Sequence, residues 1–404
     1  MNNSENAVAE APDSSETIRP FQFHAEQADL DDLKRRIEAT RWPEKEPVDD
    51  PSQGVPLAVV KVLAKYWASQ YDWRKIEAKI NSYPNFITKI DGLDIHFIHV
   101  RSQHENALPI LITHGWPGSI IEQMKVIDPL TNPTAYGGNA ENAFHVVIPS
   151  IPGYGFSERP AETGWGPERI AKAWVTLMKN IGYDRFLGQG GDWGGVITDI
   201  MAAQSPENVI GIHTNFAGVI PPEVDVAAFR GEPAPSGLSV EEQKTFDELS
   251  YTYKNVAYAF IMGSRPQSLY GIADSPVGLA AIMLDHDPRS LALISRFFAG
   301  VNEGLTRDDV LDNITLFWLT NTAISACRLY WENKNSFWGI KGVNVPVAVS
   351  VFPDELYTAP RSWSEKAYPN LMYYHELNKG GHFAAWEQPE MFTQELRAGF
   401  SSLR

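Results

Sequence analysis

Hydrophobic residues change their period along the first hundred residues. Over residues 29–43 and 56–70 they recur every three to four positions, which predicts two helices. The period then becomes two over residues 86–90 and 93–100, which flank an Asp-Gly pair at 91–92. Asp-Gly between alternating segments is typical of a β-hairpin, so the chain is expected to enter a sheet here.

Beyond residue 100, short apolar runs alternate with helical patterns. Strands that are apolar throughout and separated by helices indicate a parallel sheet covered on both faces. Near residue 221 this alternation stops, and residues 240–334 are predicted to be mostly helical before strand signals return. The predicted strands are 108–113, 144–148, 185–189, 209–214, 345–351 and 371–375, and the predicted core helices are 119–127, 167–181, 193–205 and 389–402.

These patterns predict the α/β fold class, with a helical extension before the sheet and a helical lid inserted into it. In open parallel sheets, ligands bind beyond the carboxyl ends of the strands, where such a lid would lie. The expected divisions are a disordered tail (1–20), an N-terminal extension (21–95), a first core part (96–220), a helical lid (221–334) and a second core part (335–404).

The charge of the chain excludes some classes of partner. Its 404 residues include 34 Lys and Arg against 50 Asp and Glu, a net charge of −16. This excess of acid argues against nucleic acid or an anionic membrane surface as partners, because both need clustered cations. No stretch of about 18 apolar residues occurs, so no membrane span is expected. With a single cysteine, Cys327, and no secretory signal, a cytoplasmic location is expected.

Residues 186–195 hold the most informative motif of the chain. They read Phe-Leu-Gly-Gln-Gly-Gly-Asp-Trp-Gly-Gly and lead from an apolar strand through glycines into a helix. Gly190 and Gly194 bracket Asp192 with the spacing of the nucleophile elbow of α/β-hydrolases, a strained turn that needs small neighbours. Asp192 is therefore the candidate nucleophile, and the alternative is that it only caps the helix that follows.

A carboxylate nucleophile restricts the chemistry. It can attack saturated carbon and form an alkyl–enzyme ester, which suits epoxides and alkyl halides better than amides. Residues 111–118, Leu-Ile-Thr-His-Gly-Trp-Pro-Gly, follow the first core strand, where this fold supplies one N–H of the oxyanion hole. The backbone amides of Trp116 and Trp193 are the expected pair, while His114 is expected to be structural.

The expected general base lies near the end of the chain. His382 stands in Gly-Gly-His-Phe at 380–383, between a predicted strand and the last helix. In this fold the histidine follows the nucleophile and the acid along the chain. The acid that orients His382 is expected after strand 345–351, where Asp354 and Glu355 are adjacent. Spacing alone does not choose between these two carboxylates.

With these motifs the chain resembles the microsomal-type epoxide hydrolases of the α/β-hydrolase fold, over nearly everything after the tail. The motifs are specific together and not singly. They are Asp-Leu-Lys-Arg-Arg at 32–36, Thr-Arg-Trp-Pro at 40–43, His-Gly-Trp-Pro at 114–117, Gly-Asp-Trp-Gly at 191–194, Asp-Ser-Pro-Val-Gly-Leu-Ala at 274–280 and Gly-Gly-His-Phe-Ala-Ala at 380–385.

The resemblance implies roles for individual residues. Asp192 would be the nucleophile, His382 the base and, from its place after a Phe-Pro pair, Glu355 the acid. Members of the family usually place two lid tyrosines over the epoxide oxygen, and Tyr258 resembles the first, with a packed aromatic as the alternative. Where the second is expected in a Leu-Tyr-Trp segment, this chain has Phe317, which would contact substrate without donating a hydroxyl.

The expected function is therefore the hydrolysis of a small apolar epoxide to a vicinal diol, with water as second substrate and with no cofactor or metal. The first rival is a haloalkane dehalogenase on the same scaffold, which Tyr258 disfavours because a halide needs no proton, and which Phe317 leaves open. The second rival is a ligand-binding homologue without catalysis. The oligomeric state cannot be read from the sequence, and a homodimer stays open.

Overall fold

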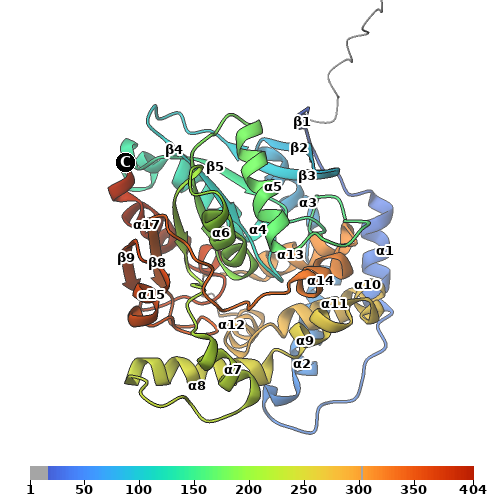
Figure 1. Ribbon diagram of the computed structural model, residues 1–404. Helices are drawn as coiled ribbons and strands as arrows, with labels where there is room; N and C mark the ends of the chain where they lie inside the picture. Colours follow the sequence, from blue (N-terminus) through green and yellow to red (C-terminus); the bar gives the residue numbers. More distant parts are fainter. Residues whose placement is uncertain (1–16, 302–303) are drawn as a thin grey trace, which may run out of the picture.

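The computed structural model describes residues 17–301 and 304–404, and this part of the chain forms a mixed sheet of nine strands (Figure 1). The strand order is β1-β2-β3-β5-β4-β6-β7-β8-β9. The strands are β1 Arg19–Pro20, β2 Asn85–Ile90, β3 Leu93–Val100, β4 Leu108–Thr113, β5 Phe144–Pro149, β6 Phe186–Gly190, β7 Val209–Thr214, β8 Val347–Val351 and β9 Leu371–Glu376.

The sheet is antiparallel at one edge and parallel over the rest. Strands β1, β2, β3 and β5 pair antiparallel, whereas β5, β4, β6, β7, β8 and β9 pair in parallel. All residues of β6 and β8 are buried, because helices cover both faces of these central strands. The carboxyl ends of β4, β6 and β8 therefore meet at one edge of the parallel part.

The tail was predicted to extend to residue 20, and this boundary is wrong at its end. Arg19 and Pro20 form β1, which pairs with Ile87 and Phe86 of β2. Residues 1–16 lie outside the described part of the chain, so the expected disorder there is not addressed. The hairpin predicted around the Asp-Gly pair is confirmed as β2 and β3.

The helices of the extension and the core are close to the predicted ones. The predicted helix 29–43 ends earlier, at Glu38. Helix α3, Trp73–Ser82, was not predicted. The side chain of Asp72 caps α3 by accepting a hydrogen bond from the amide of Arg74 (3.0 Å). The helices are α1 Gln27–Glu38, α2 Leu57–Ser69, α3 Trp73–Ser82, α4 Ile120–Thr131, α5 Pro167–Asn180, α6 Asp192–Gln204, α15 Arg361–Ala367, α16 Ala384–Glu387 and α17 Pro389–Gly399.

Between β7 and β8 the described chain contains helices and no strand that pairs into the sheet. In Figure 1 these helices lie below the sheet and to its lower right, next to α1 and α2. Their position supports boundaries near residues 220 and 334, which stay a prediction, whereas the boundary predicted between 95 and 96 falls inside β3. The helices are α7 Pro222–Arg230, α8 Val240–Asn255, α9 Ala257–Ser264, α10 Tyr270–Asp274, α11 Pro276–Leu284, α12 Pro288–Phe298, α13 Arg307–Leu319 and α14 Ala323–Glu332.

Polar contacts tie the N-terminal extension to lid helix α13. The hydroxyl of Tyr71 donates a hydrogen bond to Asp312 (2.7 Å), and the indole N–H of Trp67 donates to the hydroxyl of Thr315 (3.0 Å). The extension thus holds one of the helices that cover the sheet edge. Among the described helices, none has the length and apolar character that crossing a membrane would require.

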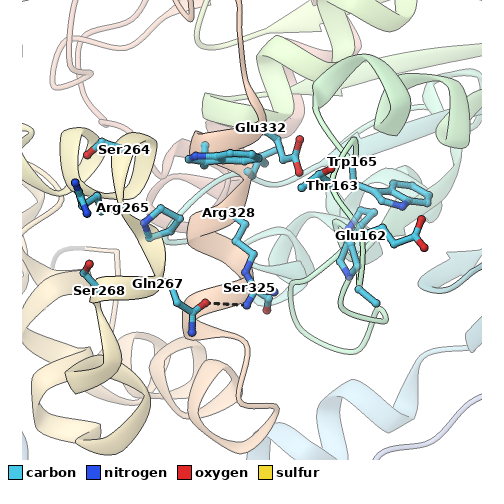
Figure 2. Close-up of a pocket in the computed structure, with 16 residues that line it drawn as sticks. Glu162, Thr163, Trp165, Ser264, Arg265, Gln267, Ser268, Ser325, Arg328 and Glu332 are labelled. Carbon is cyan, nitrogen blue, oxygen red and sulfur yellow. Dashed lines mark hydrogen bonds between the residues drawn. The ribbon is translucent and has the colours of Figure 1, made fainter.

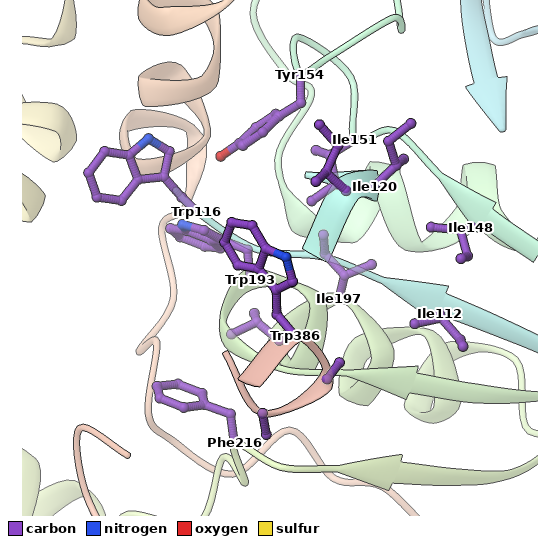
Figure 3. Packing of buried hydrophobic residues seen from close by; sticks show 14 of the residues in the cluster. Ile112, Trp116, Ile120, Ile148, Ile151, Tyr154, Trp193, Ile197, Phe216 and Trp386 are labelled. Carbon is purple, nitrogen blue, oxygen red and sulfur yellow. The ribbon is translucent and has the colours of Figure 1, made fainter. Parts of the chain in front are cut away.

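Buried aromatic residues fill the space where β4 and β6 end. Figure 3 shows Trp116, Trp193 and Tyr154 grouped at this edge, with aliphatic residues such as Ile112 and Ile197 behind them. Each of these side chains is at most 2% exposed. The charged groups at the strand ends are therefore surrounded by apolar walls.

Candidate active site

Asp192 lies on the sharp turn that joins β6 to α6. Its φ is +51°, in the left-handed region that non-glycine residues rarely adopt. A Cβ added to Gly194 would lie 1.9 Å from the carbonyl oxygen of Thr113, and one added to Gly190 would lie 2.1 Å from that of Gly194. The strand and the helix approach too closely for any side chain at these two positions, as an elbow requires.

The side chain of Asp192 faces the loop after β4. Its Oδ1 accepts a hydrogen bond from the backbone N–H of Trp116 (2.8 Å), and Gly115 leaves room for it, since a Cβ there would lie 2.3 Å from Oδ1. Gly191 occupies the N-cap position of α6, and no side chain caps that helix. The alternative that Asp192 only caps the helix is therefore wrong.

Two further side chains complete a linear arrangement with Asp192. His382, from the loop after β9, places Nε2 3.7 Å from Oδ2 of Asp192, and its Nδ1 lies 2.6 Å from Oε1 of Glu355. Glu355 follows β8, and its neighbour Asp354 instead pairs through its backbone with the Gly380–Gly381 segment. The structure thus brings Asp192, His382 and Glu355 together and leaves Asp354 outside.

Nearby carboxylates control the protonation of His382. Burial alone would lower the pKa of this imidazole, but the negative charges of Glu355, Asp192 and Asp287 outweigh burial and raise the pKa to about 10. The ring therefore carries a proton at neutral pH. A change that neutralises Asp192 removes one of the charges that hold this proton.

The two amides expected to form an oxyanion hole flank Asp192. The N–H of Trp116 already contacts the Asp192 carboxylate. Trp193 follows Asp192 in the first turn of α6, where a backbone N–H has no acceptor within the helix. His114 is hydrogen-bonded to the loop backbone, since its Nε2 accepts from the amide of Ile151 (3.2 Å).

Two lid tyrosines lie against these tryptophans. The ring of Tyr258, on α9, stacks on Trp116 at 4.6 Å between centroids, and Tyr330, on α14, meets the edge of Trp193 at 4.9 Å. Together with Asp192, both tyrosines line a pocket of about 300 Å³. Burial and then the surrounding groups, including ionised Asp192, raise the pKa of both phenols well above their ordinary value, so both keep their protons.

Phe317 was expected to stand beside Tyr258, and this expectation is wrong. Helix α13 directs Phe317 into the core, where it is 1% exposed and packs against Tyr154 at 6.0 Å between ring centroids. The second phenol comes from Tyr330 instead. The signal was present in the sequence, because residues 329–331 read Leu-Tyr-Trp without any substitution.

A second imidazole that the sequence analysis did not identify lies against His382. His286 joins α11 to α12, its ring centroid is 4.2 Å from that of His382, and its Nδ1 lies 2.9 Å from Asp287. Its Nε2 is buried and has no hydrogen-bond partner among the described residues. Asp192, His286 and His382 offer ligand atoms within 4.8 Å of one another, so these groups could hold a divalent metal ion. The sequence gives no signal for the contact between His286 and His382, because an adjacent His-Asp pair is common in loops; only the fold brings the two rings together.

A larger pocket of about 520 Å³ opens elsewhere, between the lid and residues 152–165 (Figure 2). Ser325, Arg328 and Glu332 line it from α14, and Arg328 donates a hydrogen bond to Gln267 (3.1 Å). Neither Asp192 nor His382 lines this pocket. The candidate active site is therefore the smaller, apolar pocket above the elbow.

Comparisons with known proteins agree with this geometry. The family model described as "Epoxide hydrolase N terminus" matches residues 18–123, and the model of the alpha/beta hydrolase fold matches residues 109–230. A putative epoxide hydrolase of Stigmatella aurantiaca is 47% identical over 96% of this chain and 86% of its own length. Epoxide hydrolase 1 of Sus scrofa is 36% identical over 95% of this chain and 88% of its own.

Solved structures extend the similarity to the whole fold. The juvenile hormone epoxide hydrolase of the silkworm Bombyx mori superposes with a TM-score of 0.84 at 29% identity, covering 96% of this chain and 95% of that one. The Aspergillus niger epoxide hydrolase superposes with a TM-score of 0.81 at 27% identity, covering 96% and 97%. With its elbow, its N-terminal extension and these relatives, the chain belongs to the microsomal-type epoxide hydrolases of the α/β-hydrolase fold.

Proposed function

We propose that this protein hydrolyses epoxides to vicinal diols through a covalent ester on Asp192. The observation that carries the proposal is the geometry of one carboxylate. Its Oδ1 is held by the amide of Trp116, while Oδ2 lies 3.7 Å from His382 and stays available to attack carbon. A carboxylate presented in this way at the foot of an apolar pocket suits a strained ring as electrophile.

The first half-reaction opens the ring. Oδ2 of Asp192 attacks one epoxide carbon, the C–O bond of that carbon breaks, and the electron pair moves to the epoxide oxygen. Tyr258 and Tyr330 keep their protons because burial and the nearby groups raise the pKa of both phenols. They can therefore hydrogen-bond to the oxygen and protonate it as the alkoxide forms.

The second half-reaction hydrolyses the ester. Alkylation neutralises Asp192, which removes one of the charges that raise the pKa of His382 to about 10, so the imidazolium can pass its proton to the phenolate that ring opening left. Neutral His382, oriented by Glu355, then takes a proton from a water molecule that attacks Cγ of Asp192. The amides of Trp116 and Trp193 stabilise the oxyanion before the diol leaves.

The lining of the pocket supports an apolar substrate. Phe229, Phe260, Phe337 and Trp338 contribute aromatic walls beside the catalytic groups. An aromatic wall favours epoxides with alkyl or aryl substituents over charged ones. We therefore propose a small apolar epoxide as the substrate class, with water as the second substrate.

Two phenols weaken the case for haloalkane dehalogenation. That rival stayed open because Phe317 lacked a hydroxyl, whereas Tyr330 supplies the second one at the pocket. A panel of bromoalkanes assayed for halide release beside aryl epoxides assayed for diol formation is expected to give diols only. Unchanged ligand with both classes would favour the non-catalytic homologue.

A cytoplasmic location and a homodimer are further parts of the proposal. The chain's one cysteine, Cys327, is buried and unpaired, which fits a reducing compartment. Exposed lid aromatics outside the pocket, such as Tyr270, which is 67% exposed, support contact with a second copy. Cell fractionation and sedimentation equilibrium test these two expectations separately.

The covalent route is tested by a single turnover in water enriched in oxygen-18, with enzyme in excess over a styrene-type epoxide. The new oxygen of the diol is expected to come from Asp192, so the first diol carries ordinary oxygen and the label appears in the carboxylate. Label entering the first diol directly from solvent would contradict the ester mechanism.

A further inference from the structure

A small cavity adjoins the nucleophile on the side of helix α4. Its volume is about 20 Å³, and Asp192 and His382 both line it. About 10–15 Å³ is enough to hold one water molecule when two to four polar partners are in reach. The cavity therefore has the size of a single water and borders the two groups between which ester hydrolysis must take place.

The rest of the polar lining comes from two residues at the start of α4 and one after β7. Glu122, Gln123 and Asn215 are each at most 7% exposed. Oε1 of Gln123 is buried and accepts no hydrogen bond from any described residue. A buried acceptor without a donor is costly, and a water molecule in the cavity is the donor that would satisfy it.

The carboxyl group of Glu122 is held at this place by its surroundings. It accepts a hydrogen bond from the side-chain N–H of Gln123 (2.9 Å). Gly118 leaves the space that it fills, since a Cβ added there would lie 1.7 Å from Oε2 of Glu122. Burial raises the pKa of Glu122 to about 8, so the group is mostly neutral at pH 7 and does not compete with Glu355 for the imidazolium.

We propose that Glu122 is a further catalytic residue, which positions the hydrolytic water in this cavity. The inference rests on the proposed function and adds to it the residue that orients the water molecule. While His382 is protonated, the water donates its two hydrogen bonds to Oε1 of Gln123 and to a carboxyl oxygen of Glu122. Once His382 is neutral, the bond to Gln123 shifts to Nε2 of His382, which leaves a lone pair of the water for Cγ of Asp192. As the O–Cγ bond forms, His382 takes the proton; the bond from Cγ to the alkyl oxygen then breaks, and that oxygen receives the proton.

The test separates the two half-reactions by rapid quench with an aryl epoxide, measuring the adduct by intact mass and the diol by chromatography. Glu122→Leu removes the acceptor and is expected to slow ester hydrolysis about tenfold or more, with accumulation of the adduct. Glu122→Gln keeps a carbonyl oxygen and is expected to restore hydrolysis to within about threefold of the wild-type rate.

A second variant leaves Glu122 in the chain. Gly118→Ala displaces its carboxyl group, so the variant is expected to accumulate adduct as Glu122→Leu does. Ester hydrolysis in Glu122→Leu at the wild-type rate, or ester formation slowed as much as hydrolysis, would overturn the inference. Failure of the proposed function would give a different result: if no ester forms on Asp192, rapid quench detects no adduct even in the wild-type protein.

Discussion

At the scale of single residues, strain at Asp192 determines where its carboxylate points. A φ of +51° costs on the order of 1–3 kcal/mol for a residue with a side chain. In this conformation the carboxylate accepts a hydrogen bond from the amide of Trp116 and does not cap α6, whose N-cap residue is Gly191. Tyr258 and Tyr330 line the same pocket as Asp192 and have phenols that burial keeps protonated, so the proposed nucleophile and the proposed acids share one pocket.

The tyrosine pair gives a prediction at this scale. Tyr258→Phe and Tyr330→Phe are each expected to lower the rate of ester formation roughly 10- to 100-fold, because each removes one hydrogen bond to the developing alkoxide. Stopped-flow fluorescence or rapid quench with excess enzyme measures this rate. Tyr251→Phe, at a lid residue that is 55% exposed, is the matched control and should leave it unchanged. An unaltered rate of ester formation in Tyr330→Phe would contradict the assignment of Tyr330 as the second hydrogen-bond donor to the epoxide oxygen.

At the scale of elements, four strand ends bring the site together. The loops after β4, β6, β8 and β9 carry Trp116, Asp192, Glu355 and His382, and helix α6 begins at Asp192, the proposed nucleophile. Parallel pairing places these loops at one edge, although the residues they carry are up to 266 positions apart in the chain. The close approach of α6 to β4 fixes the turn that presents Asp192.

This close approach can be tested with alanine at two glycines. Gly194→Ala is expected to lower the free energy of unfolding by about 3 kcal/mol, because the new methyl would overlap the carbonyl oxygen of Thr113. Gly271→Ala is the control: it lies in helix α10 with no atom within 4 Å of the added methyl and should be neutral or stabilising by about 0.5–1 kcal/mol. Urea unfolding measures both, and equal stability of the two variants would contradict the packing described for the elbow.

Elements with strong periodicity were predictable, and positions that depend on packing between elements were not. The strands 108–113 and 209–214 have the predicted bounds, since continuous apolar runs between turn signals define them locally. Helix α3 was missed because one of its buried positions is Glu77, a charged residue that interrupts the apolar pattern.

The same distinction applies to the candidate site. Glycine spacing alone pointed to Asp192, because the steric need for small neighbours is local. Choosing between Phe317 and Tyr330 required knowing which lid helix turns toward the sheet edge, and that depends on how α13 and α14 pack. His286 escaped notice for the same reason, since its contact with His382 spans almost a hundred residues.

At the scale of the whole molecule, the N-terminal extension holds the lid through buried polar contacts. Tyr71 donates to Asp312 on α13, and Trp67 donates to Thr315 one turn further along. Burial raises the pKa of Asp312 to about 8, so the folded state retains a proton that the unfolded chain has lost above about pH 4. The burial of this carboxyl group therefore links the stability of the molecule to pH.

The sign of this link can be measured. A carboxyl group whose pKa is raised by folding stabilises the protein below its unfolded pKa, and this contribution is lost as the pH rises toward about 8. Asp312→Asn is therefore expected to be more stable relative to wild type at pH 8.5 than at pH 5, with urea unfolding at both pH values as the measurement. Asp49→Asn, at a fully exposed side chain, is the control. A relative stability of Asp312→Asn that does not change with pH would contradict the assignment.

If Asp192 carries the substrate as an ester that His382 helps to hydrolyse, this ester should be visible in the intact mass of His382→Gln after exposure to an aryl epoxide. Without the base the ester should persist, so the protein mass is expected to rise by one substrate mass, with the adduct on the peptide that contains Asp192. The double variant Asp192→Asn/His382→Gln should gain no mass. An unchanged mass in His382→Gln, or the same gain in the double variant, would contradict the account.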